Sequence, residues 1–391
     1  MSHVLRPDPR WSSSAIRDLL EQARAPGVIS LAGGLPAAEL LPTERLRDRS
    51  AHVFELHGAH TLQYGPSVGE PALREILGSY EAVHPDDLIV TAGSQQALDL
   101  VARGLTRPGD VVVIESPGYV GAIQVLQAAG LDLIACPVDH DGLDTAALEE
   151  LLGNGLRPAL VYVNPNHQNP TGGSLSPARQ AQLLALADQF GFWVVADDPY
   201  REITFDRGVP SPEHGLHPAT SDHVLLLGSL SKTLSPGLRL GWCSGHRSAI
   251  TRLEMAKQAA DLHTATFNQL LAASVLSDHR WWIQHLQALR VAYQERRAQL
   301  LDALELHLPD ARVSRQSGGF FLWLELSGVD TTTLLTAALE AGVAFVPGSV
   351  FSLDDQPNDA LRLSYSYADV DTIEEAVSRL AEATMRAAIR S

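Results

Sequence analysis

The residues that point most directly to chemistry lie in a short segment around Lys232. Residues 225–242 read LLLGSLSKTLSPGLRLGW, so the lysine follows an apolar run and has Ser229, Ser231 and Arg239 close to it in sequence. A single lysine is usually a solvated surface residue. A lysine that follows a buried strand, among small hydroxyl residues and near an arginine, can instead form an imine while its neighbours bind an anion.

Two further apolar runs end in residues suited to binding a ligand. In LIVTAGSQQALDL, Gly93 and Ser94 precede a helical pattern that opens at Gln95, and a helix N-terminus of this kind is a good phosphate site. In ESPGYVGA, Tyr119 follows a sharp Pro-Gly turn and could stack on a flat ring, although core packing is the commoner role of a single tyrosine.

Acidic and amide side chains follow two more runs. VNPNHQNPTGG places the amide of Asn169 where it could bond a ligand oxygen. FWVVADDPY ends in Asp197 and Asp198, and a carboxylate directly after a buried strand is drawn toward a cation, because an unpaired buried charge is costly. Solvated loop acids are the alternative.

These groups combine into the binding site of one ligand. In an open α/β sheet, ligands bind beyond the carboxyl ends of the strands. A helix start, serines and an arginine suit a phosphate, a carboxylate suits a ring nitrogen, an amide suits a ring hydroxyl, and the lysine suits an imine. Pyridoxal 5'-phosphate requires this combination, so the sequence predicts that cofactor on Lys232.

The elements that position these residues are strands alternating with helices, which is typical of a mostly parallel sheet. The predicted strands are 88–91, 111–115, 131–136, 160–164, 193–197, 224–229 and 238–243. Helical spacing occurs at 95–105 and 177–190, and a long helical stretch covers 281–306. We therefore predict an α/β fold with a seven-stranded large domain and a smaller α+β domain.

The chain has 391 residues, more than a single core usually holds, so more than one domain is expected. We predict an N-terminal segment over 1–40, a large domain over 41–280 and a small domain over 281–391. A helix is predicted at 14–23. The extended ISLAGGLP segment that follows is expected to pack on the small domain or on a neighbouring subunit.

Composition narrows the class of partner. The 46 acidic and 29 basic side chains give a formal net charge of −17, which argues against nucleic acid and anionic membranes as partners. Cys136 and Cys243 lack the spacing of a zinc site, no metal is predicted, and the thiols fit a reducing compartment. The start MSHVLRPDPRW has no apolar run typical of a signal peptide, so we expect a cytoplasmic protein.

The order of the motifs resembles the fold-type I aminotransferases of class I and II over nearly the whole chain. Within that family the chain is most similar to the group that includes 2-aminoadipate and kynurenine aminotransferases. The motifs that carry the resemblance are SLAGGLP, QYGPSVGEPALRE, TAGSQQAL, QNPTG, ADDPY, GSLSKTLSPGLRLGW, AKQAADLHT and LRLSYS.

The resemblance implies a role for each site residue. Lys232 would bind the cofactor covalently, Asp197 would face the ring nitrogen, and these two with Tyr200 would be the catalytic residues. Asn169 and Tyr200 would donate to the ring oxygen, and Tyr119 would stack on the ring. The implied phosphate ligands are Ser94, Gln95, Ser229, Ser231, Arg239 and, from the second subunit of a homodimer, Tyr64.

On the substrate side the resemblance implies Arg362 as the clamp for the α-carboxylate, with Asn169 and Gly34 beside it. Arg17 lies where relatives of the 2-aminoadipate group have a mobile arginine; the alternative is an exposed helix residue. The implied reaction is ping-pong transfer of an amino group between an L-amino acid and a 2-oxo acid, with glutamate and 2-oxoglutarate as one pair. Many relatives have an aromatic residue at His167, which leaves a structural role and an altered substrate pocket open.

Two other functions remain as alternatives. A pyridoxal-phosphate enzyme of specialised metabolism could use the same site for elimination, decarboxylation or oxidation, because the motifs do not distinguish these reactions. Some transcription regulators carry this fold behind a DNA-binding domain. That alternative is less favoured, because the motifs begin within the first few tens of residues and the chain is acidic.

Overall fold

The computed structural model describes residues 19–390 apart from 20, 206–214 and 354–358. Most of the helix predicted at 14–23, including Arg17, therefore lies outside the described residues. The first described strand, β1 (Ile29–Ser30), pairs in parallel with β12 (Val343–Ala344). This pairing holds the ISLAGGLP segment against the C-terminal part of the chain.

The larger sheet has eight strands in the order β2-β9-β8-β7-β6-β3-β4-β5. Among its pairs, β9 runs antiparallel to both neighbours and β5 runs antiparallel to β4, whereas the others are parallel. The strands are β2 (Leu88–Thr91), β3 (Val111–Ser116), β4 (Asp132–Asp139), β5 (Gly142–Leu143), β6 (Leu160–Val163), β7 (Trp193–Asp197), β8 (Val224–Ser229) and β9 (Gly241–Ser244).

The α/β fold with a mostly parallel sheet is confirmed, with two corrections. The prediction of seven strands is one too few, because the two-residue strand β5 is too short to produce a sequence pattern. The last strand is predicted over 238–243, but the observed strand β9 begins three residues later, at Gly241. Pro236–Leu238 form a 3-10 turn and Arg239 has a φ of 50°, so the chain becomes extended only at Gly241.

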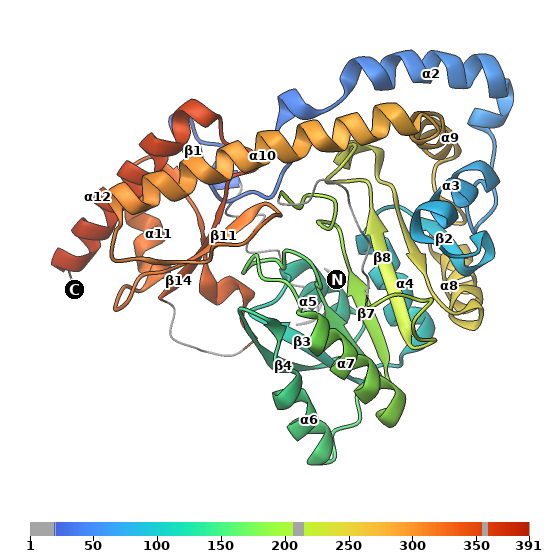
Figure 1. Ribbon diagram of the computed structural model, residues 1–391, viewed down its shortest axis with the longest axis horizontal. Coiled ribbons are helices and arrows are strands. Elements are labelled where there is room, and N and C mark those ends of the chain that lie inside the picture. The colour runs from blue at the N-terminus through green and yellow to red at the C-terminus, as the bar shows by residue number, and fades with distance from the viewer. Residues whose placement is uncertain (1–18, 20, 206–214, 354–358, 391) are drawn as a thin grey trace, which may run out of the picture.

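Helices cover both faces of this sheet (Figure 1), as βαβ units require. Successive residues of β3 point to opposite faces of the sheet. Ile114 packs in one core with Leu98 and Ile250, whereas Val113 packs in a second core with Leu148 and Leu183. The helices on the first face are α4 (Ser94–Leu105), α5 (Val120–Ala128) and α8 (Arg247–Ala260), and those on the second are α6 (Thr145–Gly153) and α7 (Pro177–Phe190).

The sequence explains where these helices begin and end. In α7, the Ser176 side chain accepts a hydrogen bond from Arg179 N, Pro177 occupies the first turn, and Gly191 ends the helix in the left-handed conformation. In α4, by contrast, Gly93 stands at the N-cap with a φ of 89° and no side-chain cap. The start of α4 is therefore available to an external anion.

A smaller antiparallel sheet has the order β10-β11-β14-β13, from Arg312–Val313, Phe321–Glu325, Ala360–Ser364 and Val346–Pro347. In Figure 1, helices α11 (Thr331–Glu340) and α12 (Ile373–Arg390) lie beside this smaller sheet. In Figure 1 the long helix α10 (His279–His307) runs from α9 (Thr266–Leu276), beside the larger sheet, to α12. The remaining helices are α2 (Thr43–His57), α3 (Pro71–Glu81) and 3-10 turns at Ala38–Leu40, Gly58–Leu62, Pro85–Asp87, Gly348–Phe351 and Val370–Thr372.

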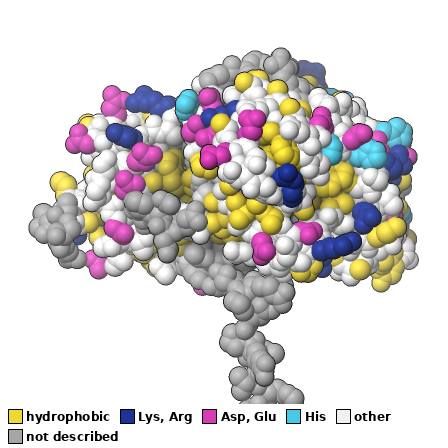
Figure 2. Space-filling view, turned by 90° about the horizontal axis from the view of Figure 1, so that it is seen from below, with side chains coloured by type: hydrophobic (Ala, Val, Ile, Leu, Met, Phe, Trp, Pro, Cys, Tyr) yellow, Lys and Arg dark blue, Asp and Glu magenta, His cyan; other side chains and the backbone are white. Residues whose placement is uncertain are grey.

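The surface carries both signs of charge. On the face seen in Figure 2, lysine and arginine side chains are interspersed with aspartate and glutamate, and hydrophobic side chains gather near its middle. Among the described residues, no helix is both long and apolar enough to cross a membrane.

Candidate active site

A cavity of about 360 Å³ lies beyond the carboxyl ends of β7 and β8. Most of the residues singled out from the sequence meet in it, although they come from distant parts of the chain. It is lined by Gly34, Ser94, Gln95, Tyr119, Asn169, Asp197, Tyr200, Ser229, Ser231, Lys232, Arg239 and Arg362, together with Asn164, Pro199, Pro236 and Phe321.

Lys232 projects into this cavity directly after β8. Its Nζ donates a hydrogen bond of 2.8 Å to the Gly34 carbonyl oxygen and lies 5.8 Å from the centre of the Tyr200 ring. Burial, followed by the positive charges of Arg362 and Arg239, lowers the pKa of the Lys232 ammonium to about 8. The lowered pKa leaves a larger neutral fraction near pH 7 than an ordinary lysine has, which makes this amine a usable nucleophile.

Asp197 ends β7 on the other side of the cavity. Its Oδ2 accepts a hydrogen bond of 2.7 Å from the Tyr162 hydroxyl, whereas its Oδ1 is buried with no partner among the described residues. Burial raises the pKa of Asp197 to about 6, while the Tyr162 bond and the charge of Lys232 lower it. A buried carboxylate with an open lone pair calls for a cation opposite it.

The start of α4 and the turn after β8 form a cradle for an anion. A Cβ at Gly93 would lie 2.5 Å from Nη2 of Arg239, so only glycine lets this guanidinium approach the helix start. Ser231 N donates to Ser229 Oγ at 3.1 Å, which holds the two serines in one turn. Backbone N–H groups, hydroxyls and a guanidinium are the donors that a phosphate needs.

Two tyrosines are held in place by their neighbours. The Tyr119 hydroxyl donates to Gln95 Oε1 at 3.2 Å, and burial raises the pKa of Tyr119 to about 12. Tyr200 packs edge-on against Phe320 and Phe321, with ring centres 5.4 and 5.8 Å apart. Both side chains are therefore ordered by the protein itself.

Arg362 enters the cavity from β14 of the smaller sheet. Its Nη1 donates to Asn169 Oδ1 at 2.7 Å and its Nη2 donates to the Ala32 carbonyl oxygen at 2.6 Å. The guanidinium lies 4.1 Å from the centre of the Phe321 ring and 4.9 Å from that of Phe351. Its orientation is thus set by cation-π contacts as well as by hydrogen bonds.

One described residue from the sequence prediction, Tyr64, does not line the cavity. Tyr64 is 74% exposed and packs edge-on against His263, with ring centres 5.6 Å apart. Arg17 lies outside the described residues.

The residues that line the cavity fit pyridoxal phosphate. The unpartnered Oδ1 of Asp197 suits a protonated ring nitrogen, the bare Gly93 with Arg239 suits a phosphate, and Lys232 suits a carbonyl carbon. The comparison with known families agrees: the family described as Aminotransferase class I and II matches residues 27–380. The chain belongs to this family.

Individual relatives bear out the assignment. A 2-aminoadipate transaminase from Thermus thermophilus is 40% identical over 377 residues, covering 96% of this chain and 94% of the relative. Aromatic-amino-acid aminotransferase 1 from Thermococcus litoralis is 36% identical over 382 residues, covering 95% and 91%. The crystal structure of an α-aminoadipate aminotransferase from Thermus thermophilus with N-(5'-phosphopyridoxyl)-L-leucine has a TM-score of 0.90 at 38% identity, covering 98% and 97%.

The protein is a pyridoxal-phosphate-dependent aminotransferase of fold type I, as the motifs predicted. Its site also contains residues that the sequence reasoning missed. Asn164 Nδ2 donates to the Tyr162 hydroxyl at 3.2 Å and to the Asp197 carbonyl oxygen at 2.8 Å, and Asn164 N donates to Glu115 Oε2 at 3.0 Å. A tyrosine within the aliphatic strand LVYV was the available signal for this network.

We expect Tyr162→Phe in this aminotransferase to weaken cofactor binding by about 10-fold, because Asp197 loses a hydrogen bond to its charged form. Equilibrium dialysis against the cofactor measures the effect. Tyr293→Phe is a matched control, since Tyr293 is equally buried but its hydroxyl accepts from Ala37 N outside the cavity. Equal cofactor affinity in the two variants would contradict the role of Tyr162.

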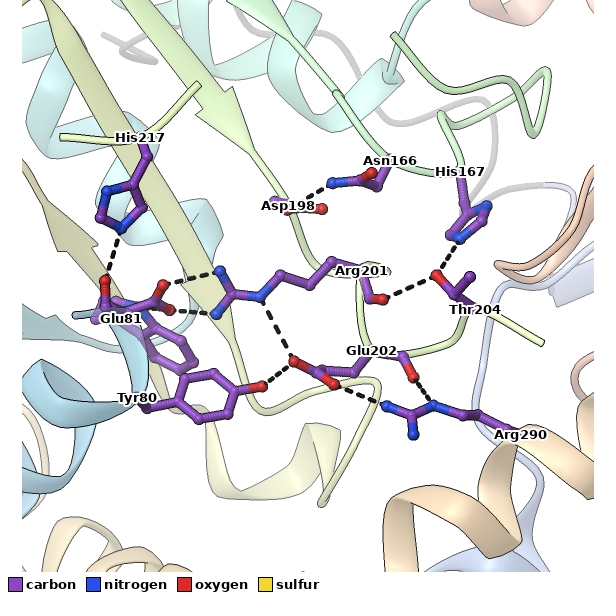
Figure 3. Close-up of polar contacts among 11 residues, drawn as sticks. Tyr80, Glu81, Asn166, His167, Asp198, Arg201, Glu202, Thr204, His217 and Arg290 are labelled. Atoms are coloured by element: carbon purple, nitrogen blue, oxygen red, sulfur yellow. Dashed lines mark hydrogen bonds and ion pairs between the residues drawn. The ribbon is translucent and has the colours of Figure 1, made fainter. Parts of the chain in front are cut away.

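Behind the cavity, a buried ion cluster supports the segment that carries Asp197 and Tyr200 (Figure 3). Arg201 forms a two-pronged ion pair with Glu81, and Glu202 accepts hydrogen bonds from Tyr80 and, at 2.9 Å, from Arg290 of α10. Trp242 Nε1 donates to Glu81 Oε1 at 2.9 Å. Charged groups therefore hold this segment in place from the side opposite the cavity.

His167 does not line the cavity. It lies beside a separate hollow of about 1000 Å³, and its Nε2 is 2.8 Å from Thr204 Oγ1. It is 3% exposed, with a left-handed φ of 50° that is uncommon for a residue other than glycine. Of the two roles left open by the sequence, this placement favours the structural one.

Proposed function

We propose that Lys232, Asp197 and Tyr200 carry the catalysis and that Arg362 binds the α-carboxylate of the substrate. The observation that supports this most is the meeting of Lys232 Nζ, the unpartnered Asp197 Oδ1 and the Arg362 guanidinium in one cavity. A covalent amine, an acid for the ring nitrogen and a carboxylate clamp are the parts that amino-group transfer requires.

Each part has a defined task in the proposal. The bound cofactor supplies an electron sink for the bond that breaks at the substrate Cα. Asp197 keeps the ring nitrogen protonated. Lys232 Nζ, with a pKa lowered to about 8, takes the proton from Cα and returns it elsewhere, because such an amine can act as both base and acid near pH 7. Asn169 and Tyr200 donate to the ring oxygen.

The proposed reaction uses glutamate and 2-oxoglutarate as one pair and a longer L-amino acid as the other donor. The names of the two relatives, one for 2-aminoadipate and one for aromatic amino acids, support a pocket that takes acidic and apolar side chains. Product analysis tests the reaction: a new amino acid should form only when a 2-oxo acid is supplied. Ammonia or carbon dioxide as the main product would instead indicate elimination or decarboxylation.

Arg17 is proposed to meet the distal carboxylate of acidic substrates and to move away for apolar ones. We expect Arg17→Ala to lower kcat/KM for glutamate and 2-aminoadipate by about 10-fold, the range of a charged hydrogen bond, and to leave leucine unchanged. Half-reaction kinetics with acidic, aliphatic, aromatic and basic amino acids measure this. An equal effect on every substrate, or no effect on any, would contradict the proposed movement of Arg17.

We also propose a homodimer, with Tyr64 reaching the phosphate of the neighbouring subunit. The proposal is supported by exposed apolar side chains around α2 and the turn that follows it, where a partner would bury them. They include Phe54, Leu56, Leu62 and Tyr64, together with Leu262 after α8.

The dimer proposal predicts that Tyr64→Phe weakens cofactor binding by about 10-fold, through loss of a bond to a charged phosphate. Cofactor dialysis measures this change, and analytical ultracentrifugation should give twice the chain mass of 42.1 kDa. Tyr367→Phe is the control, since Tyr367 is also an exposed tyrosine but lies after β14. A fully active monomer would contradict the shared site.

Location and partners complete the proposal. A cytoplasmic location is supported by two buried, unpaired cysteines, which fit a reducing compartment. The net charge of −17 argues against a nucleic-acid partner, as does the mixture of charges in Figure 2.

A further inference from the structure

Two chain segments contribute residues that are proposed to contact the cofactor ring in the cavity. The first, residues 164–173, carries Asn169, and the second, residues 197–204, carries Asp197 and Tyr200. The distance between Asn169 and Tyr200 depends on how these segments are joined, since neither side chain bonds the other in the described contacts. Besides the Arg362 bond to Asn169 and the Asn164 bond to the Asp197 carbonyl oxygen, the contacts between the segments away from the cavity therefore help to place the two side chains.

Two side-chain hydrogen bonds link the segments on their outer side (Figure 3). Asn166 Nδ2 donates to Asp198 Oδ2 at 2.9 Å, and His167 Nε2 lies 2.8 Å from Thr204 Oγ1. Both links start from residues immediately before Gln168 and Asn169. They end on either side of Tyr200 in the second segment.

The direction of the second link follows from proton counting. The Thr204 hydroxyl has one proton and donates it to the Arg201 carbonyl oxygen at 3.0 Å. In this arrangement the hydroxyl accepts from His167, in the tautomer that has its proton on Nε2. The link therefore runs from His167 through Thr204 to the backbone of Arg201, the residue that follows Tyr200.

The chain just before β11 leaves space for this histidine. A Cβ at Gly318 would lie 2.3 Å from His167 Nε2, and a Cβ at Gly319 would lie 2.6 Å from His167 Cβ. These glycines lead directly to Phe320 and Phe321, the two rings on which Tyr200 packs. His167 thus sits where both ring-side segments and the chain that supports Tyr200 come together.

We propose that His167 and Thr204 are positioning residues, whose hydrogen bond sets the separation of the Asn169 amide and the Tyr200 hydroxyl at the cofactor ring oxygen. The inference rests on the ring-oxygen roles proposed for Asn169 and Tyr200. Without the link, the two donors move apart and stabilise the ionised ring oxygen less well. Lys232 Nζ, once joined to the carbonyl carbon of the cofactor, would then keep its proton to higher pH, because the neighbouring negative charge is less compensated.

The test is a pH titration of the visible absorbance of the bound cofactor, in holoenzyme without substrate. His167→Phe keeps a ring but removes the N–H donor, and Thr204→Val removes the hydroxyl at nearly constant volume. Each should raise the midpoint by roughly half a pH unit to one unit. The double variant should shift no further than the larger single shift, because both changes remove one shared link.

Thr145→Val is the matched control. The Thr145 hydroxyl donates to Gln182 Oε1 at 2.7 Å, and this bond joins α6 to α7 away from the cavity. Its loss should lower thermal stability to an extent similar to Thr204→Val but leave the midpoint unchanged. A midpoint that moves as much in Thr145→Val as in Thr204→Val would overturn the inference.

Asn169→Ala and Tyr200→Phe separate this inference from the proposal beneath it. If both raise the midpoint while His167→Phe and Thr204→Val do not, the positioning role is wrong and the ring-oxygen roles stand. If neither raises it, the ring-oxygen roles are wrong and the inference falls with them. A change in KM ratios among amino acids at an unchanged midpoint in His167→Phe would make His167 a specificity residue instead.

Discussion

Lys232→Ala is expected to abolish turnover and covalent attachment of the cofactor while the fold persists. The side chain ends in the cavity, where its Nζ has one hydrogen bond, to Gly34, and no ion pair among the described residues, so truncation removes little that holds the fold. Without this amine, no other side chain of the cavity can both bond the cofactor carbon and move the Cα proton. We expect a loss of at least about 10⁴-fold in kcat, more than a general base alone contributes.

Borohydride reduction followed by peptide mapping checks the attachment directly. The chain has one other lysine, Lys257, which makes the assignment a choice between two positions. Lys257 is buried away from the cavity, where its Nζ pairs with Asp261 at 2.8 Å. A pyridoxyl label on Lys257, or one that persists in Lys232→Ala, would show that the attachment site is wrong.

Asp197→Asn is expected to bind the cofactor yet lose activity by about 10³-fold, the scale on which a buried charge supports a reacting group. An amide opposite the ring nitrogen cannot hold a proton there, because it offers no compensating negative charge. The substitution is nearly isosteric, so the Tyr162 hydroxyl keeps a partner of the same shape, and the Asn164 bond to the backbone carbonyl oxygen of residue 197 is unaffected. Dialysis and steady-state kinetics separate retained binding from lost turnover.

Asp198→Asn is the control for this variant. Asp198 accepts from Asn166 behind the cavity, and burial raises its pKa to about 7, so the amide replaces a group that is partly neutral at pH 7. A small effect is expected. Near-normal turnover in Asp197→Asn, with a large loss in Asp198→Asn, would assign the ring nitrogen to the second acid.

Local sequence could predict most of the strands and the strand-end residues. Runs such as 193–197 and 224–229 are continuous and apolar, and their limits agree with β7 and β8. Since parallel strands bring their carboxyl ends to one edge, the motifs after them had to converge. Ten of the residues named from the motifs after these strands line the same cavity as a result.

Contacts between distant residues were beyond prediction from local pattern. Arg362 bonds Asn169 across 193 positions of sequence, and the geometry of that pair depends on how the two sheets pack. The hydrogen bond between Tyr162 and Asp197 could not be predicted for the same reason, because a tyrosine in an apolar strand is expected to be a core residue until its partner is known. His167 stands out in the sequence as a departure, but only its position beside Thr204 gives it a role to test.

Helix α10 affects how the molecule unfolds. Its 29 residues span about 43 Å, and one continuous core contains Trp282, Tyr293 and Leu300 of this helix. The same core includes Leu77 of α3, beside the larger sheet, and Leu380 of α12, beside the smaller one. Melting α10 strips apolar cover from both, so heat should produce a single cooperative unfolding transition rather than two.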